Sequence, residues 1–196
     1  MIPAVVARTL QAVPATDGEF RFQPTPLFRP ALEGVSGFAE VPRDDDGFFR
    51  RIPLVVPLES GEFFPSLSLA LLARLGGQDS ATLARTLAGP EPIELSLPEW
   101  DEARGKGRGT SPLRFYQDED WKINFVGPSG SFLTIGSDAV YPLGASGGPV
   151  ADDNPFRDRI VLIGATFADS RDAFPTPRGL MYGVEIHANI LHTLLT

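Results

Sequence analysis

The pattern of hydrophobic and polar positions first predicts several short strands. Residues 4–7 form an apolar run close to the start of the chain. Residues 93–97 place an isoleucine and two leucines at alternate positions, which is the pattern of a half-buried strand. Residues 121–126 have strand composition and end at a Gly-Pro pair. We therefore expect a strand in each of the three stretches.

Two further stretches are typical of a β-hairpin. Residues 37–41 and 48–56 are rich in Phe, Ile and Val, and the sequence Pro-Arg-Asp-Asp-Asp-Gly between them favours a turn. Period-two spacing puts four apolar residues of the second strand on one face: Phe48, Ile52, Leu54 and Val56. Residues 20–30 contain three prolines and little periodicity, so we expect an ordered loop there.

Four helices are predicted from apolar spacing and capping residues. Residues 65–75 start at a proline, end at two glycines and carry an apolar stripe of Leu67, Leu71 and Leu75. Residues 80–88 predict a helix capped by Asp79 or Ser80, and residues 137–141 predict a short one. The last helix is expected over residues 183–195, with a stripe of Val184, Ala188, Leu191 and Leu195.

The longest β-branched run is residues 159–165, with the sequence Arg-Ile-Val-Leu-Ile-Gly-Ala. A continuous apolar run of this kind is typical of a strand covered on both faces, so we expect a central parallel strand. Residues 166–179 then form a loop that leads to the last helix. The whole pattern predicts a single domain over residues 1–196 of the α/β class, with a mixed, partly parallel sheet, flanking helices, Gly/Pro-rich loops and a C-terminal helix.

Composition adds turns and an acidic charge to this picture. The chain has 196 residues, of which 20 are Gly and 19 are Pro, so many connections are turns or loops. Residues 98–112 contain Arg-Gly-Lys-Gly-Arg-Gly and are expected to form a mobile surface loop. The net charge of −8 disfavours nucleic acid and other anionic partners. The absence of cysteine excludes disulfides, thiolate metal ligands and cysteine nucleophiles.

The usual signatures of catalytic and metal sites are missing from the sequence. His187 and His192 are five residues apart, so on a helix their side chains point about 140° apart, unlike a zinc-binding pair. The Asp-Asp-Asp-Gly turn at residues 44–47 resembles the start of a calcium loop, but its twelfth position would be Val55, which cannot coordinate a cation. No nucleophile elbow, P-loop or dinucleotide-binding glycine pattern occurs. We predict no catalytic residue, no metal, no cofactor and no enzyme activity.

One region is a candidate site for a small polar ligand. Ligands of open α/β sheets bind beyond the carboxyl ends of the strands, and residues 166–179 occupy that place. The helix that follows offers free backbone amides at its N-terminus. The polar residues of the loop are Thr166, Asp169, Asp172, Thr176 and Arg178. The simpler interpretation, which we prefer, is that Asp172 and Arg178 only hold the loop in place through local hydrogen bonds.

Several stretches match, in order, the motifs of a known family. Residues 123–128 read Ile-Asn-Phe-Val-Gly-Pro and are followed by a Phe-x-Thr step. Residues 159–166, 172–177 and 183–189 are similar to KIVLIGAT, D.F.TP and GVEIHAN. Upstream, residues 37–54 contain Asp-Gly-Phe-Phe-Arg-Arg-Ile-Pro-Leu, and residues 64–67 read Phe-Pro-Ser-Leu. Together these motifs resemble the CHASE2 domain family from about residue 35 to the end of the chain.

The resemblance implies a role and a location. CHASE2 domains are extracytoplasmic sensor modules of bacterial transmembrane receptors, and they usually precede transmembrane helices and an intracellular histidine kinase, nucleotide cyclase or Ser/Thr kinase. The chain is thus expected to be the periplasmic or extracellular part of an inner-membrane protein, attached only through transmembrane helices that it lacks. The family's domain normally begins with a further strand–helix–strand region. We therefore expect a piece trimmed at its N-terminus, with an uncovered sheet edge that could pair with another chain.

Motif positions add Glu185, His187 and Asn189 to the candidate binding residues, although a motif can equally encode local geometry. The main hypothesis is a ligand-binding sensory module that passes a small-molecule or protein signal through its C-terminal helix to the membrane segment. The alternative is a dimerisation or protein-partner platform without a small ligand, and a homodimer is left open. A hydrolase that uses Asp172 and His187 is the least favoured hypothesis. The stimulus and the attached output domain are not identified by the sequence.

Overall fold

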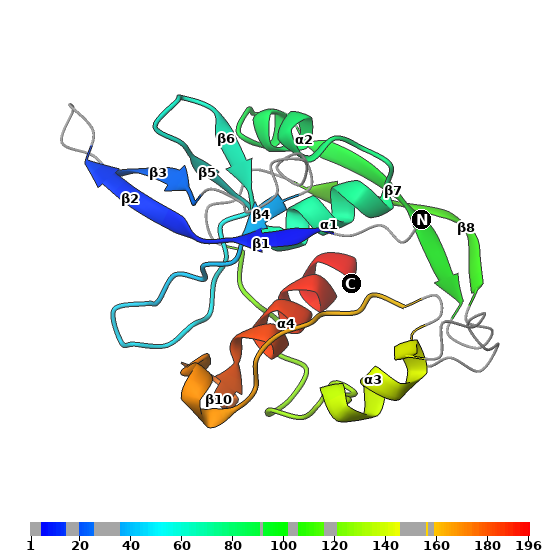
Figure 1. Ribbon diagram of the computed structural model, residues 1–196. Coiled ribbons are helices and arrows are strands. Elements are labelled where there is room, and N and C mark those ends of the chain that lie inside the picture. Colours follow the sequence, from blue (N-terminus) through cyan, green and yellow to red (C-terminus); the bar gives the residue numbers. More distant parts are fainter. Residues whose placement is uncertain are drawn as a thin grey trace.

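The computed structural model describes residues 5–14, 20–25, 36–90, 92–101, 106–115, 121–145, 156 and 159–196. Strands and helices are mixed along the chain, which confirms the α/β class (Figure 1). Within the described residues the strands pair two by two into five small sheets, and one of these pairs is parallel. None of the helices in this part of the chain combines the length and the apolar character needed to cross a membrane.

The strands are short and mostly antiparallel. Their bounds are Val6–Arg8 (β1), Leu10–Pro14 (β2), Phe20–Pro24 (β3), Ser36–Phe38 (β4), Val55–Pro57 (β5), Phe63–Pro65 (β6), Ile93–Asp101 (β7), Lys106–Phe115 (β8), Ala173–Thr176 (β9) and Gly179–Tyr182 (β10). β1 runs parallel to β4, and the antiparallel pairs are β2–β3, β5–β6, β7–β8 and β9–β10.

The helices are α1 (Leu67–Leu75), α2 (Ser80–Leu87), α3 (Ser137–Ala145) and α4 (Gly183–Leu195), with a 3-10 turn at Ala168–Ser170. All four lie where the sequence predicts them, and α3 is longer than expected. The Ser66 hydroxyl caps α1 by accepting a hydrogen bond from the amide of Leu69 at 3.1 Å. The Asp79 carboxylate caps α2 by accepting one from the amide of Thr82 at 2.8 Å.

The buried faces of α1 and α4 differ from the predicted stripes. On α1 the three leucines of the predicted stripe are half-buried, whereas Leu69, Leu72 and Ala73 are fully buried. At the start of α1, Ser66 forms an isolated parallel bridge with Phe38 of β4. On α4 the predicted Leu195 is exposed, and Ile186, Ile190 and Leu194 face the core together with Leu191. In Figure 1, α4 lies alongside α1, and the two helices are in contact.

The main core gathers these helix faces around β7. It includes the alternating residues of β7 and of the segments 52–54 and 123–125: Ile93, Leu95, Leu97, Ile52, Leu54, Ile123 and Phe125. The predicted strand 93–97 and its buried face are therefore confirmed, and the predicted strand 4–7 corresponds to β1.

Four predictions of local structure are wrong, and three of them concern residues before 116. Residues 37–41 and 48–56 do not form a hairpin, because β4 pairs with β1 and β5 pairs with β6; only the tight turn at residues 44–47 is present. Residues 20–24 of the expected loop 20–30 form β3, and residues 26–30 lie outside the described part. The expected mobile loop 98–112 is largely strand, in β7 and β8, with residues 102–105 outside the described part.

The fourth wrong prediction is the central parallel strand at residues 159–165. Among the described residues this stretch joins none of the sheets, and several of its apolar side chains are exposed to solvent. Residues 121–126, another predicted strand, belong to none of the named strands; within the described chain they make a single antiparallel bridge, between Lys122 and Arg51. Side chains of α4 satisfy their other edge, as described below.

Gly37 of β4 is a buried contact point that tests this architecture. A Cβ atom at Gly37 would lie 2.6 Å from the carbonyl oxygen of Ser66 and 2.7 Å from the amide nitrogen of Leu67. Replacement by alanine must push β4 away from the start of α1. We expect Gly37→Ala to lower the free energy of unfolding by about 1–3 kcal/mol, measured by urea denaturation.

The matched control is Gly76→Ala at the end of α1. Gly76 has φ −79°, which alanine adopts readily, and the nearest atoms to an added Cβ are at an ordinary 3.4 Å. This variant should change the unfolding free energy by less than about 0.5 kcal/mol. Equal losses in the two variants would contradict the close approach of β4 to α1.

Candidate functional site

One face of α4 binds the backbone of the segment that runs from residue 121 to residue 130. Three polar side chains, each four residues after the last, share this face. Each accepts a hydrogen bond from a backbone amide of the segment. The bonds are Asn124 N to Thr193 Oγ1 at 2.9 Å, Val126 N to Asn189 Oδ1 at 2.9 Å, and Gly130 N to Glu185 Oε1 at 2.6 Å.

The opposite edge of this segment is bound to residues 50–52. The amide of Ile52 donates to the carbonyl of Trp121 at 3.0 Å, and the amide of Ile123 donates to the carbonyl of Arg50 at 2.8 Å. Successive amides of an extended chain point to opposite edges. The helix therefore lies where a neighbouring strand would lie in a sheet. Its side chains supply the hydrogen-bond acceptors that the carbonyl groups of such a strand would supply.

Asn189 lies at the centre of this arrangement and is 1% exposed. Besides accepting from Val126, its amide group donates to the carbonyl of Glu185 at 2.8 Å and contacts the sulfur of Met181 at 3.3 Å. Thr193 in turn donates its hydroxyl to the carbonyl of Asn189 at 2.7 Å. The hydrogen-bonding capacity of this buried amide is thus used within the chain, as burial of a polar group requires.

Glu185 is also buried, with 7% of its surface exposed. Its carboxylate accepts hydrogen bonds from the hydroxyl of Ser129 and from the amide of Gly130. It lies in the first turn of α4, where the positive end of the helix dipole stabilises a negative charge. The carboxylate therefore fixes the end of the 121–130 segment against the start of the helix.

His187 lies on another side of α4 and contacts a distant part of the chain. Its Nε2 is 3.0 Å from the carbonyl oxygen of Ala39. Because a carbonyl can only accept, Nε2 carries the proton and Nδ1 is the unprotonated nitrogen of the neutral ring. Nδ1 is buried and has no hydrogen-bond partner within the described residues. Burial lowers the pKa of His187 below its ordinary value of 6.5, against the opposing effects of Ala39 and of the Asp172 carboxylate.

Asp172 joins the loop before α4 to the start of the helix. Its carbonyl oxygen accepts a hydrogen bond from the amide of Gly183 at 3.0 Å. Its carboxylate packs on Gly183, where a Cβ would be 2.5 Å from Oδ1. Burial raises the pKa of Asp172, and the nearby His187 opposes that shift. Asp172 and His187 thus form an electrostatically coupled pair at the N-terminal end of α4.

The rest of the expected loop 166–179 is more ordered than predicted. Its second half is the hairpin β9–β10, which closes at Gly179 with a φ of 102°. Thr176 holds the turn: its hydroxyl donates to the carbonyl of Gly179 at 2.7 Å and accepts from the amide of Arg178 at 3.2 Å. The hairpin is attached to the body of the protein by the amide of Phe49, which donates to the carbonyl of Pro175 at 3.0 Å.

Of the candidate binding residues predicted from the sequence, four lie close together in pairs in the structure and three are exposed. Asp172 and His187 each influence the pKa of the other, and the side chain of Asn189 donates a hydrogen bond to the carbonyl of Glu185. The side chains of Thr166, Asp169 and Arg178 are exposed. Sequence reasoning missed Thr193, although its spacing of four residues from Asn189 and eight from Glu185 is the helical signal that could have identified it.

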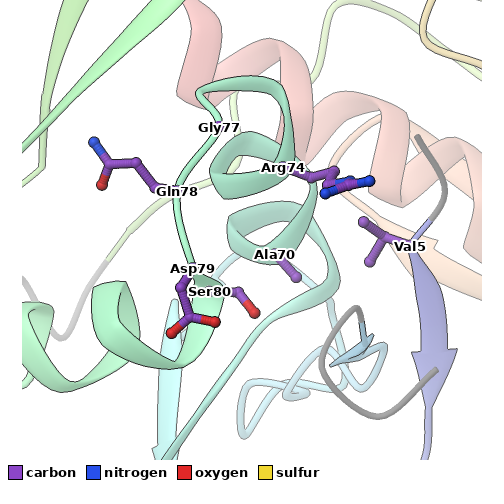
Figure 2. A pocket seen from close by; sticks show the side chains of 7 residues that line it. All are labelled: Val5, Ala70, Arg74, Gly77, Gln78, Asp79 and Ser80. Atoms are coloured by element: carbon purple, nitrogen blue, oxygen red, sulfur yellow. The ribbon is translucent and has the colours of Figure 1, made fainter. Parts of the chain in front are cut away.

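A hollow of about 290 Å³ lies elsewhere, between α1, α2 and the start of β1 (Figure 2). It is lined by Val5, Ala70, Arg74, Gly77, Gln78, Asp79 and Ser80, none of which the sequence nominates. Arg74 and Val5 border it on one side, and Asp79 and Ser80 lie on another. The Asp79 carboxylate accepts the capping hydrogen bond of α2 and is therefore already engaged within the chain. We interpret the hollow as a space left where α1 and α2 meet, and we assign it no ligand.

Asn189 provides a direct test of the contact between α4 and the 121–130 segment. Asn189→Ala leaves the part-buried amide of Val126 without its acceptor, and we expect the free energy of unfolding to fall by about 1–3 kcal/mol. The control is Asn124→Ala: this side chain is exposed, and only the backbone amide of Asn124 bonds to α4. The control should change stability by less than about 0.5 kcal/mol in the same urea titration. A near-neutral Asn189→Ala would argue against the contact.

His187 predicts a dependence of stability on pH. As the pH falls through 6.5, the unfolded chain binds a proton that the folded chain, with its lowered pKa, does not yet bind. Stability therefore falls with falling pH in this range, by at most about 1.4 kcal/mol per pH unit. Asp172 has the opposite effect, but at lower pH, because its raised pKa starts from 3.8.

The measurement is the unfolding free energy at pH 7.5 and pH 5.5. The side-chain amide of glutamine in His187→Gln can still donate a hydrogen bond to Ala39. In this variant the difference in unfolding free energy between pH 7.5 and pH 5.5 should be smaller than in the wild type. His192→Gln, in the last turn of the same helix, is the control and should leave the difference as it is. If His187→Gln shows the same change in unfolding free energy with pH as the wild type, His187 is not the group that causes the pH dependence.

Comparison with known protein families identifies this domain. A model of the CHASE2 domain family matches residues 4–196. Neither the curated proteins nor the solved structures contain a match to this chain. CHASE2 domains are extracytoplasmic sensor domains of transmembrane receptors, which agrees with a sensory rather than a catalytic module. Since the match spans almost the whole sequence, this chain belongs to the CHASE2 domain family.

Proposed function

We propose that this domain senses a signal outside the cytoplasm and passes it on through a change in α4. The observation that supports this most directly is the number of separate segments that attach to the N-terminal half of that helix. The 121–130 segment binds through Glu185 and Asn189, Ala39 binds through His187, and the loop before the helix binds through Asp172. A ligand that moves any of these segments also acts on α4.

A signal of this kind requires two arrangements of the helix with different affinities for the ligand. The contacts of α4 with its neighbours are of a kind that can break and re-form together. They are hydrogen bonds from side chains of one helix to the backbone of other segments, and Thr193, Asn189 and Glu185 are linked to one another. Loss of one of these bonds weakens the next, so the face is suited to a cooperative change.

The candidate ligand residues have different roles in this proposal. Thr166, Asp169 and Arg178 are exposed and are free to contact a small polar molecule or a protein signal. Asp172 and His187 connect that loop with the start of α4. Glu185 and Asn189 are already bonded inside the protein, so they would respond to the ligand by holding or releasing the 121–130 segment.

We further propose that the receptor's output is a histidine kinase, a nucleotide cyclase or a Ser/Thr kinase, reached through transmembrane helices. The location would then be the periplasmic or extracellular side of an inner membrane. A platform for dimerisation or for protein partners, with no small ligand, is the alternative. An exposed apolar segment at residues 160–166 favours that alternative.

The experiment compares two threonines of the C-terminal part of the chain in the membrane-embedded receptor that contains this domain. Thr193→Val keeps the shape of the side chain and removes the acceptor for Asn124. Thr196→Val is the control, because the Thr196 hydroxyl bonds only to the carbonyl of His192 at an exposed position. We expect Thr193→Val to shift the unstimulated output about fivefold or more, the lower end of typical coupling between sites, and Thr196→Val to leave it unchanged.

Hydrogen exchange of the isolated domain accompanies the activity assay. Thr193→Val should raise the exchange rate of the amide of Asn124 and of its neighbours in the 121–130 segment. If that exchange increases while the receptor output stays at the wild-type level, α4 is not the transmitting element and the proposal fails. If both change together, in either direction of output, the proposal is supported.

A further inference from the structure

Residues 160–166 form an apolar segment that has the sequence of a strand, but it pairs with no strand in the described part of the chain. Ile160 is 42% exposed, Val161 47% and Ile163 96%. In the described chain, no backbone amide or carbonyl of this segment takes part in a hydrogen bond. A β-branched run with free backbone groups is a template for pairing with another strand.

One face of the segment is already covered. Leu162 packs against the main core, and Gly164 lies so close to α4 that a Cβ there would be 2.6 Å from the Cβ of Val184. Val161 and Ile163 are exposed to solvent, and so is Ile160 at the start of the segment. The segment is therefore held on the body of the protein by one face, while its other face and its backbone remain available to a partner.

We propose that two copies of this chain associate by pairing their residues 160–166 as antiparallel strands around a two-fold axis at Ile163. A two-fold interface needs a surface that is complementary to itself. In this register Ile163 lies opposite Ile163 of the second copy, and Val161 lies opposite Ala165. Each of these cross-strand pairs joins two apolar side chains, which is the favourable combination in a sheet.

The charges at the two ends of the segment also match in this register. Arg159 precedes the segment, and Phe167 and Asp169 follow it, all three exposed. Antiparallel pairing places Arg159 of one copy opposite Phe167 of the other and diagonal to Asp169. Both positions are within reach of a long cationic side chain, through a cation–π contact and an ion pair. The two-fold axis makes each contact twice, which offsets part of the repulsion between two chains of net charge −8.

The association is expected to be weak because two short strands bury little surface. It does not depend on the proposed signalling role of α4, and it can be tested on the domain alone. Sedimentation of the wild-type chain over a range of concentrations should show a monomer that converts to a dimer as the concentration rises. A mass that stays monomeric up to the highest soluble concentration would overturn the proposal.

The register is tested with single cysteines, for which the cysteine-free chain is well suited. Residues directly opposite in an antiparallel pair lie about 4.5–5.5 Å apart between Cα atoms, which suits a disulfide. Ile163→Cys should cross-link into a dimer under mild oxidation. Val161→Cys alone should not, but a mixture of Val161→Cys and Ala165→Cys chains should. Leu133→Cys, at a position that is 84% exposed, gives the background rate.

Cross-linking of Ile163→Cys at the background rate, or equal cross-linking of Val161→Cys alone, would refute the two-fold register. A charge exchange provides an independent measurement that does not alter the apolar residues. Arg159→Glu and Asp169→Arg should each weaken dimerisation about threefold or more, and the double variant should restore it. Failure of the double variant to recover would equally count against the proposal.

Discussion

The hydrogen bonds between the polar face of α4 and the backbone of residues 124–130 determine much of this structure. Backbone amides that face the body of a protein need acceptors, and a helix backbone has none to offer along its side. Here Glu185, Asn189 and Thr193 supply them at successive turns, so a helix takes the place of a strand. The arrangement places two polar side chains in a helix face that also carries Ile186 and Ile190 in the core. That combination ties the position of the 121–130 segment to the exact rotation of α4.

The two halves of α4 are held in different ways. The N-terminal half is held mainly by directional bonds, from His187 to Ala39, from Glu185 to Gly130 and from Asp172 to Gly183. The C-terminal half packs through Ile190, Leu191 and Leu194, which are fully buried. Apolar packing tolerates small rotations better than hydrogen bonds do, because it lacks a strict angular requirement. The N-terminal half is therefore where a change in the surrounding loops acts most strongly on the helix.

Local signals in the sequence predicted the elements whose determinants are local. The four helices and the buried alternation of β7 follow from spacing, caps and terminating glycines near each element. Strand pairing was predicted less well because it depends on distant residues. Val55–Pro57 could not be assigned to Phe63–Pro65 from its composition, and the parallel pairing of β1 with β4 leaves no local signature. The glycines of Lys106–Phe115 suggested a loop, yet that stretch pairs with β7.

The candidate site shows the same division between local and distant determinants. Sequence motifs identified Glu185 and Asn189 but could not show that both bind the backbone of a segment about sixty residues earlier. The spacing that adds Thr193 to them was visible, because a helix face is a local property. His187 was also nominated, but its partner Ala39 is 148 residues away, and only the fold brings them together.

Residues 160–166 contact α4 and are also the segment that we propose pairs with a second chain. Leu162 contacts the core and Gly164 contacts Val184, at the start of the same helix whose polar face holds the 121–130 segment. Because only a glycine allows this approach, the segment and the helix cannot rotate independently of each other. Any partner strand that fixes the segment thereby also restricts the start of α4. Association and transmission would then be linked through one contact, between Gly164 and Val184, and the two alternatives suggested by the sequence need not exclude each other.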